Sequence, residues 1–420
     1  MSYSLIVPPI SSFPLEMRSD HFVIHYGLRN PVNGKGRGGD GVRDHILILT
    51  YLEALERLYD IMINPPWSRP HPVVDVDNRT HVFVLNEEAQ TAEDSFANLA
   101  PNSATQNVPF IVLPCRSAET TTQAELQRAT AEAVHEATHV FNYTERRYDS
   151  IMAEHWRWFD EGFAIFMETL VVSGNPDYIR YLLNWIDLPE MPLDHTNAKY
   201  QAGMFVRYLA KRLGNIFVNN VWVQSQPRER PLETIQRLLP HGQVLVSSDP
   251  NTQDLFASGY CMDPYFLWDY QSAGLAPDVF ARYGERAITE SFVLWPNRTP
   301  VQAADTLSHL ACRYYRFYLK GAVSTVDIEL TPEKRQETMP LKAEVAVITV
   351  TRQRTNRQAL RPSQAPGRGH KLSVTMGSMS LADIDHIVMV VTNCGTRPNM
   401  DDDRDDHDDE VNFSIEASAQ

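Results

Sequence analysis

Residues 131–170 read AEAVHEATHVFNYTERRYDSIMAEHWRWFDEGFAIFMETL, and the rest of the chain is interpreted around this stretch. His135, Glu136 and His139 form an H-E-x-x-H pattern inside residues 121–143, where small and apolar side chains recur at helical spacing. Positions i and i+4 lie on one face of a helix, so both histidines can direct a ring nitrogen at one point. The pattern therefore predicts a metal-binding helix.

A second predicted helix, at residues 156–172, supplies a third ligand. Glu161 lies in its W-F-D-E-G-F-A segment, and three protein ligands leave the fourth position of a catalytic zinc to water. Glu136, next to the first histidine, is then placed to accept a proton from that water instead of binding the metal. His155 and Asp160 are weaker alternatives for the third ligand, and we expect them to form local hydrogen bonds.

The residues after H-E-x-x-H distinguish two groups of zinc peptidases. The metzincin continuation is excluded, because it needs a glycine and a histidine where this chain has Asn142 and Glu145. H-E-x-x-H followed by W-x-x-E-G-F-A-x-[FY]-x-E instead resembles the gluzincin metallopeptidases, most closely their aminopeptidase N-like branch. The matching residues are His135, Glu136, His139, Trp158, Glu161, Gly162, Phe163, Ala164, Phe166 and Glu168.

The resemblance assigns roles to five of these residues. It implies that His135, His139 and Glu161 bind zinc, and that Glu136 acts as general base and then as proton shuttle. It also implies that Glu168 orients a histidine ligand from outside the ligand set. The spacing supports this role independently, because a residue seven positions after Glu161 returns to the same helix face.

A further match lies at residues 200–204, YQAGM, which resemble the Y-x-K-G-A segment of aminopeptidase N-like enzymes. The tyrosine of that segment donates to the tetrahedral oxyanion, so Tyr200 is the candidate electrophilic partner of zinc. The alternative is a tyrosine packed between helices. His195 is a weaker candidate for the same role, with a loop histidine as its alternative. The chain has no G-A-M-E-N segment, which recognises a free substrate amine in the aminopeptidases, so an endopeptidase is favoured.

These residues predict a zinc-dependent hydrolase, a metallopeptidase that acts on a peptide or protein substrate. A strand near residues 109–113 is expected to bind the substrate by backbone pairing, as sheet edges can. One alternative is a non-catalytic gluzincin-like protein that serves as a binding module. Another is a zinc centre acting on a non-peptide ester, amide or epoxide. Intact Glu136 argues against the non-catalytic alternative, because a purely structural metal site does not need that carboxylate.

Hydrophobic periodicity predicts an α+β fold with a C-terminal β-sandwich, and the resemblance implies that the part before it is a gluzincin-like catalytic domain. Residues 1–120 are predicted as the N-terminal α/β portion of the catalytic domain with a small mixed or antiparallel sheet, 121–305 as the helical portion carrying the zinc site, and 306–420 as the sandwich. The other predicted helices are 44–63, 177–185, 197–213, 231–239 and 277–283. The predicted strands are 21–26, 81–85, 109–113, 314–319, 325–330, 344–351, 371–376, 386–392 and 411–416.

Composition excludes some partners. The formal net charge of −15 argues against a nucleic-acid partner, which requires a basic surface. No segment reaches the roughly 18 apolar residues of a membrane span. The N-terminus, MSYSLIVPPISSFPLEMRSD, lacks the basic start and apolar run of a signal peptide. A cytoplasmic location is therefore expected, with secretion as the alternative, and the sequence sets no oligomeric state.

Two charged segments and four cysteines complete the sequence predictions. Asp401–Glu410 (DDDRDDHDDE) is interpreted as either a calcium site or a solvated loop. The segment lacks the spaced D-x-D-x-D-G pattern of a calcium-binding loop, which favours the solvated loop. The arginine-rich residues 352–371 are predicted as a disordered hairpin loop. The 4 cysteines form no C-x-x-C pair, which argues against a cysteine zinc site, and they are expected to be mostly small core residues.

Overall fold

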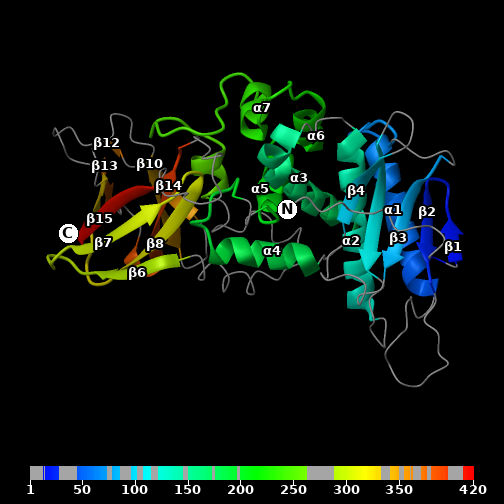
Figure 1. The fold of residues 1–420 in the computed structure, drawn as a ribbon. Coiled ribbons are helices and arrows are strands. Elements are labelled where there is room, and N and C mark those ends of the chain that lie inside the picture. The colour runs from blue at the N-terminus through cyan, green and yellow to red at the C-terminus, as the bar shows by residue number, and fades with distance from the viewer. Residues whose placement is uncertain are drawn as a thin grey trace. The chain divides into compact units, whose positions relative to one another are not determined.

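A computed structural model divides the chain into two compact units (Figure 1). The first is formed by Met1–Tyr181 with Ala202–Pro231, and the second by Leu182–Gln201 with Leu232–Gln420. The described residues are 13, 15–27, 45–72, 78–85, 96–101, 107–114, 122–144, 150–172, 176–195, 199–262, 288–332, 341–349, 354–359, 361–362, 370–375, 380–395 and 410–420.

The first unit contains a five-stranded mixed sheet with the strand order β1-β2-β3-β5-β4. β2, β3 and β5 run parallel, and they confirm the three strands predicted for this part of the chain. β1 and β4, which were not predicted, pair antiparallel at the two edges. The bounds are β1 (Leu15–Arg18), β2 (Phe22–Tyr26), β3 (Thr80–Leu85), β4 (Phe96–Pro101) and β5 (Asn107–Pro114).

The expectation that the strand at residues 109–113 offers a free edge is wrong. β5 is hydrogen-bonded to β3 on one side and to β4 on the other, so its backbone groups are already paired. The edge strand on this side of the sheet is β4 instead. β5 is apolar because it is an interior parallel strand, which is the usual reason for a continuous apolar run.

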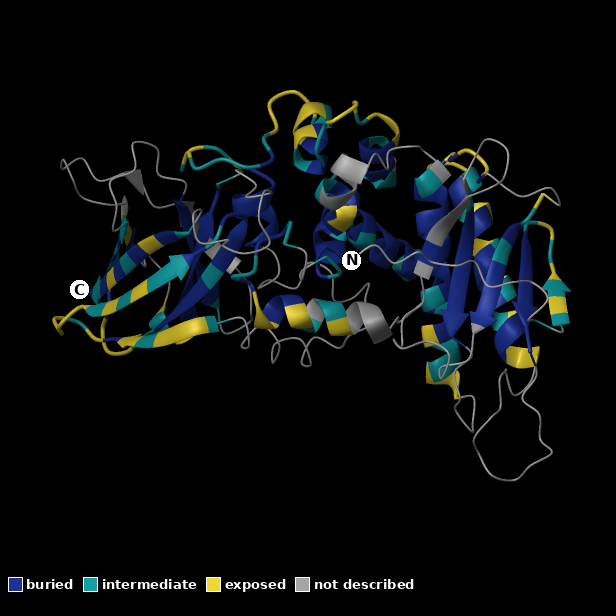
Figure 2. Cartoon of the chain, in the orientation of Figure 1, coloured by how far each residue is buried: buried dark blue, intermediate teal, exposed yellow. Residues whose placement is uncertain are grey.

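Helices cover this sheet. α1 (His45–Ile63) contacts β2, and α2 (Gln123–Thr144) contacts β4 and β5 and packs against α1. α3 (Ser150–Val171) contacts α2 and α5 (Ala202–Leu213), and α6 (Asn215–Val223) packs on α5. Figure 2 shows the interior strands and the inner faces of these helices in dark blue, so the core of the unit lies between sheet and helices.

Three boundaries differ from prediction. The helix expected at residues 156–172 begins at Ser150, so His155 lies inside α3 and not before it. The helix expected at 197–213 begins at Ala202. α6 was not predicted as a separate helix; the break before it falls at Gly214, whose φ of 89° is disfavoured for residues with a side chain. α4 (Pro176–Asp187) and α7 (Pro231–Leu238) agree closely with the predicted segments.

The second unit holds two five-stranded sheets that share one apolar core, which is the arrangement of a β-sandwich. The strand orders are β11-β10-β14-β8-β6 and β12-β13-β9-β15-β7. The bounds are β6 (Ile288–Leu294), β7 (Val301–Leu307), β8 (Ala311–Leu319), β9 (Thr325–Pro332), β10 (Leu341–Thr349), β11 (Arg354–Ala359), β12 (Arg361–Pro362), β13 (His370–Thr375), β14 (Ile384–Asn393) and β15 (Val411–Ala419).

The predicted sandwich strands are present as β8, β9, β10, β13, β14 and β15, and the α+β class is confirmed. The sandwich also includes β6 and β7, so the predicted boundary at residue 306 falls within β7. Part of the arginine-rich segment predicted as a disordered loop is β11, which pairs with β10. The helix predicted at 277–283 and residues 401–409 of the candidate calcium segment lie outside the described residues.

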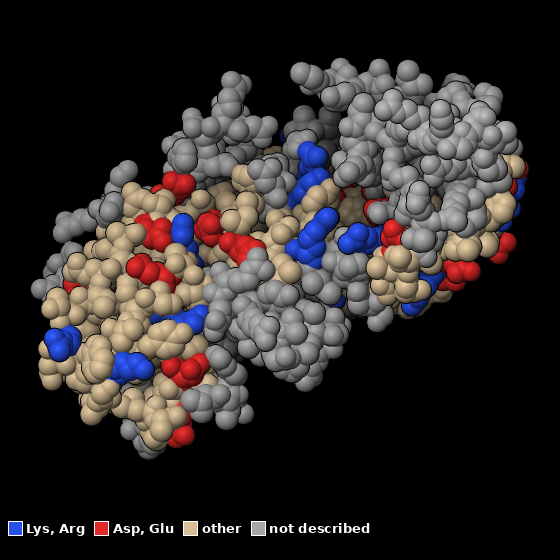
Figure 3. Space-filling view, turned by 90° about the horizontal axis from the view of Figure 1, so that it is seen from below, with Lys and Arg blue, Asp and Glu red and all other residues tan. Residues whose placement is uncertain are grey.

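The described residues also show the surface charges, the helix lengths and the cysteines that the sequence predictions concern. Acidic and basic side chains are interspersed on the face in Figure 3, over the residues that it colours. Within the described ranges, no helix has both the length and the apolar character needed to cross a membrane. Cys261, Cys312 and Cys394 are free and buried, whereas Cys115 lies outside the described residues.

Candidate metal centre

α2 is the helix that carries the two histidines. Its N-terminus has a capping box, in which the Thr122 backbone N–H donates to Glu125 Oε2 at 2.6 Å and the Glu125 N–H donates to Thr122 Oγ1 at 3.3 Å. Small residues along its inner face are fully buried and allow neighbouring helices to approach closely; they are Ala129, Ala133 and Ala137. The helix is therefore fixed at its start and along the face that holds the site.

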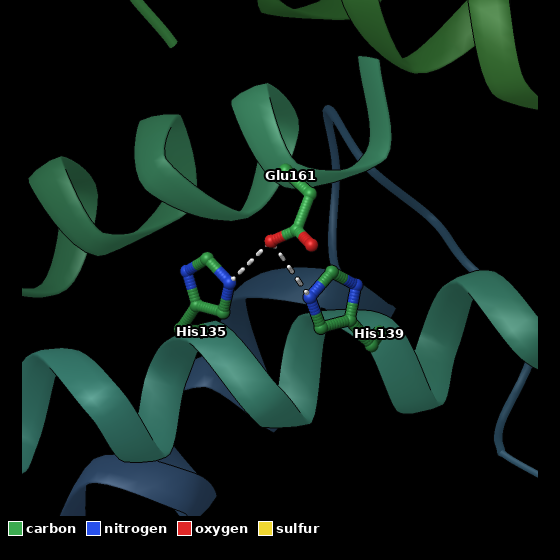
Figure 4. Close-up of side chains that lie close together, drawn as sticks. All are labelled: His135, His139 and Glu161. Carbon is green, nitrogen blue, oxygen red and sulfur yellow. Dashed lines mark hydrogen bonds and ion pairs between the residues drawn. The ribbon is translucent and has the colours of Figure 1, made fainter. Parts of the chain in front are cut away.

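His135 and His139 point from α2 toward Glu161 on α3 (Figure 4). Glu161 Oε2 lies 3.0 Å from His135 Nε2 and 3.7 Å from His139 Nε2. One ligand atom from each residue lies within 4.8 Å of the other two. The structure thus brings together the three residues that the sequence predicted as metal ligands.

Each histidine is backed by a carboxylate on its other ring nitrogen. Glu168 Oε1 lies 2.8 Å from His135 Nδ1, as the spacing along α3 required. Asp160 Oδ2 lies 3.1 Å from His139 Nδ1, in an ion-pair contact whose angle falls outside hydrogen-bond geometry. Both carboxylates favour a proton on Nδ1, which leaves Nε2 of each ring to bind a metal.

Asp160 is itself held in place by α2. Asn142 Nδ2 donates to Asp160 Oδ1 at 2.7 Å, and both side chains are buried. The sequence predicted only a local hydrogen-bonding role for Asp160, and its contact with His139 was missed. The residue is adjacent to Glu161, but only the crossing of α2 and α3 brings it to the second histidine. His155, the other alternative for the third ligand, is not part of the cluster.

The ligand cluster is a network of buried ionisable groups that shift one another's pKa values. Burial alone would lower the pKa of His135, but hydrogen bonds to Glu161 and Glu168 outweigh it and raise the pKa to about 10. Burial likewise opposes protonation of His139, yet Asp160 and Glu161 raise its pKa well above the usual value. The two histidines hold the pKa of Glu161 well below its usual value despite burial. A metal ion would therefore replace protons on the imidazoles.

Glu136 and Tyr143 are the other ionisable groups of α2 near the ligands. Glu136 is 5% exposed, and its charge contributes to the raised pKa of Tyr143, about 12, for which burial is the main cause. The Tyr143 ring stacks near His139 at 6.4 Å between centroids, and its hydroxyl donates to the Ala97 carbonyl of β4 at 3.1 Å. Tyr143 was not predicted as a site residue, although its i+4 spacing from His139 could have indicated a position on the same helix face.

Close backbone packing positions Glu161. A Cβ atom added to Gly162 would lie 2.8 Å from the Ala202 carbonyl carbon, and one added to Gly203 would lie 2.6 Å from the Ile165 side chain. The glycines of E-G-F-A and Q-A-G-M therefore let α3 and α5 cross almost in backbone contact. This crossing fixes the turn of α3 that carries Glu161.

The two candidate oxyanion donors lie in the second unit. Tyr200 is half-buried in the turn before α5, with the Lys199 ammonium 4.4 Å from its ring centroid. His195 is half-buried in a short turn region after α4. A role for either residue at the metal centre stays a prediction.

The donor set fits zinc. Ligand atoms at normal zinc–nitrogen and zinc–oxygen distances in a tetrahedral site lie about 3.3 Å apart. The contacts of Glu161 Oε2 with the two Nε2 atoms, 3.0 and 3.7 Å, bracket that spacing. The ligand side chains are 9–13% exposed, so the cluster can be reached from solvent. Two imidazoles and one carboxylate are also the chemistry that zinc accepts.

Comparisons with known proteins give a family without an assigned function. A model described as "Family of unknown function (DUF6055)" matches residues 119–247, which include both histidines and Glu161. No curated protein matches the sequence.

Three solved structures are similar to parts of the chain. PliG from Aeromonas hydrophila, a periplasmic lysozyme inhibitor of g-type lysozyme, is 11% identical over 31% of this chain and 99% of its own, with a TM-score of 0.18. A PliG-Ec mutant from Escherichia coli is 10% identical over 31% and 98%, also at 0.18. AlgX from Pseudomonas aeruginosa is 7% identical over 38% of each chain, at 0.18. These TM-scores carry no conclusion about function.

Proposed function

We propose that the protein is a zinc-dependent hydrolase, a metallopeptidase of gluzincin type. The observation that carries the proposal is the convergence of His135 Nε2, His139 Nε2 and the Glu161 carboxylate within 4.8 Å. Each imidazole has a carboxylate on its far nitrogen, an arrangement typical of metal-binding histidines. Glu136 follows the first ligand directly, in the position that H-E-x-x-H enzymes use for their base.

Each residue of the cluster has a distinct role in the proposed mechanism. His135, His139 and Glu161 would hold zinc, while Glu168 and Asp160 keep the rings oriented. Zinc, when bound, supplies Lewis acidity that polarises the scissile carbonyl and makes water more acidic. Glu136 takes the proton from the attacking water and passes it to the leaving amine, which is general base and then general acid catalysis.

The edge strand β4 supports a peptide as substrate. It lies against α2, and Tyr143 of that helix bonds to its Ala97 carbonyl. Among the described strands β4 ends the sheet, and an extended peptide can add to a sheet edge through backbone hydrogen bonds. Together with the missing G-A-M-E-N segment, a binding edge beside the metal helix favours an endopeptidase. Tyr200 remains the oxyanion donor that the Y-x-K-G-A resemblance implies, as a prediction from sequence.

The second candidate function is a non-catalytic or non-peptide-acting gluzincin-like protein that serves as a binding module. It requires only the metal-binding cluster, and it is consistent with a matching family that has no assigned activity. The two candidates differ in what Glu136 does. A binding module needs no base beside the metal, whereas a hydrolase loses turnover without it.

Digestion of a mixed peptide library tests the proposal. Zinc-loaded protein should generate new internal termini, read by mass spectrometry, and a chelator should stop the reaction until zinc is restored. Zinc binding without cleavage of any peptide would contradict the peptidase and support the binding module. Ester or amide model substrates in the same assay separate a peptidase from a hydrolase of other bonds.

A further inference from the structure

A second cluster of buried charges lies wholly inside the second unit and has no part in the metal centre. It forms where η4 (Phe256–Tyr260), a single π-helical turn, meets β10. The side chains of Asp254, Lys342 and Glu344 are 0%, 1% and 3% exposed. Buried lysines are rare and need compensation, and π-helical turns often mark functional sites.

The lysine amine is in contact with a carboxyl group. Lys342 Nζ lies 2.6 Å from Asp254 Oδ2 and 3.7 Å from Glu344 Oε1, and it also donates to the Thr252 carbonyl. The 2.6 Å contact is with a carboxyl oxygen, and it holds the amine next to the Cγ carbon that carries this oxygen, with the entropy of encounter already lost on folding. Water is excluded from all three side chains, which removes the solvent that normally favours separate ions.

The other oxygen of Asp254 is held by backbone donors. The Ala257 N–H donates to Asp254 Oδ1 at 2.5 Å, and the Ser258 N–H donates to the same atom at 3.3 Å. Two N–H groups aimed at one carboxyl oxygen form the arrangement that stabilises an oxyanion during acyl transfer. The cluster thus contains an amine, an electrophilic carbon and an oxyanion site.

The Ser258 hydroxyl contacts both carboxyl groups of the cluster. Ser258 Oγ lies 3.2 Å from Asp254 Oδ2 and is hydrogen-bonded to Glu344 Oε1. The Ser258 hydroxyl therefore bridges the two carboxyl groups and provides a path for proton transfer between them. Burial raises the pKa of Asp254, although Lys342 opposes the rise, and a neutral carboxylic acid is the form that condenses with an amine.

The geometry points to an intramolecular isopeptide bond between Lys342 Nζ and Asp254 Cγ, formed with Glu344 as the proton-transfer group. The nitrogen–carbon bond forms and the Cγ–Oδ2 bond breaks. Of the three ammonium protons, one stays on the amide nitrogen and two leave with Oδ2 as water, relayed by Glu344 and the carboxyl group. The opposite charges of Lys342 and Asp254 cancel, so charge balances and no oxidant is needed. The bond would join the residues just before η4 covalently to β10.

The mass of the full-length protein under denaturing conditions tests this inference. The expected mass is lower than that of the sequence by one water, and reducing agents should not restore it. Trypsin should release a branched peptide that joins residues 238–282 to residues 336–352, and fragmentation should place the link at Asp254 and Lys342. Unlinked peptides from the whole population would overturn the inference.

Variants identify the atoms involved. Lys342→Arg and Asp254→Ala should each restore the full mass, and Glu344→Gln, which matches the volume of the native side chain, should slow or abolish the loss of water. Lys371→Arg, at an exposed position of the same sandwich, should leave the link intact. A link that hydroxylamine cleaves would be an ester through Ser258, and it would refute the assignment to Lys342. Full linkage in Glu344→Gln would refute the role of Glu344.

Discussion

Replacing Glu168 tests whether the outer carboxylates prepare the histidines for a metal. Glu168 Oε1 lies 2.8 Å from His135 Nδ1, and its side chain is 4% exposed, so the hydrogen bond is charged and shielded from water. Such bonds contribute about 1.5–3 kcal/mol, roughly twice as much as neutral ones. Glu168→Gln keeps a neutral acceptor and removes the charge, so it should cost about 1.4 kcal/mol, or tenfold in zinc affinity.

Glu168→Ala removes the acceptor as well and should weaken zinc binding by up to about 100-fold. Competition with a chromophoric chelator at fixed pH measures both values. Glu53→Gln is the matched control, because it removes the same charge from an exposed position on α1 and should leave zinc affinity unchanged. Wild-type zinc affinity in both Glu168 variants, with the fold intact by circular dichroism, would refute the orienting role.

Three further predictions concern packing, protons and the edge strand. Gly162→Ala should destabilise the protein by about 1–3 kcal/mol, because the new Cβ would lie 2.8 Å from the backbone of α5. Helix propensity alone would predict a gain in stability. A raised melting temperature would therefore contradict the close packing of α3 on α5. Zinc binding at pH 7 should release about two protons, since the raised pKa values keep His135 and His139 protonated without metal. Zinc affinity should therefore increase with pH until the pKa of His135, about 10, is passed. Calorimetry in buffers of different ionisation enthalpy counts the released protons, and zinc binding without proton release would contradict this prediction. Tyr143→Phe should cost about 1 kcal/mol of stability through the lost bond to Ala97 without changing zinc affinity, and a large change in affinity would place the hydroxyl at the metal instead.

The ligand cluster could be predicted from sequence because helical spacing and the H-E-x-x-H…E motif together indicate it. The i+4 spacing of His135 and His139, and the i+7 spacing of Glu161 and Glu168, fix which side chains share a face. The contact between Asp160 and His139 could not be predicted in the same way. It depends on how α2 and α3 cross, and that crossing is set by the other contacts of the two helices.

Strands were predicted where their patterns are strongly apolar and missed where they are not. The interior strand β5 has a continuous apolar run, whereas the edge strand β4, FANLAP, and the sandwich strand β7, VQAADTL, contain polar and small residues that propensity assigns to loops. The order of strands in a sheet also cannot be predicted from local sequence patterns, and for this reason β5 was predicted as an edge strand. The pairing of Asp254 with Lys342 spans 88 positions and follows only from the fold.

Turnover by Glu136→Gln is the most direct measurement of the proposed mechanism. Zinc-loaded wild-type protein and the variant should be compared on the same peptide library, with zinc content measured in both. We expect the variant to bind zinc as the wild type does and to lose cleavage by at least about 100-fold, the usual contribution of a general base. Cleavage that survives in the variant would contradict the assignment of Glu136 as base, and wild-type protein that binds zinc but cleaves nothing would contradict the hydrolase itself.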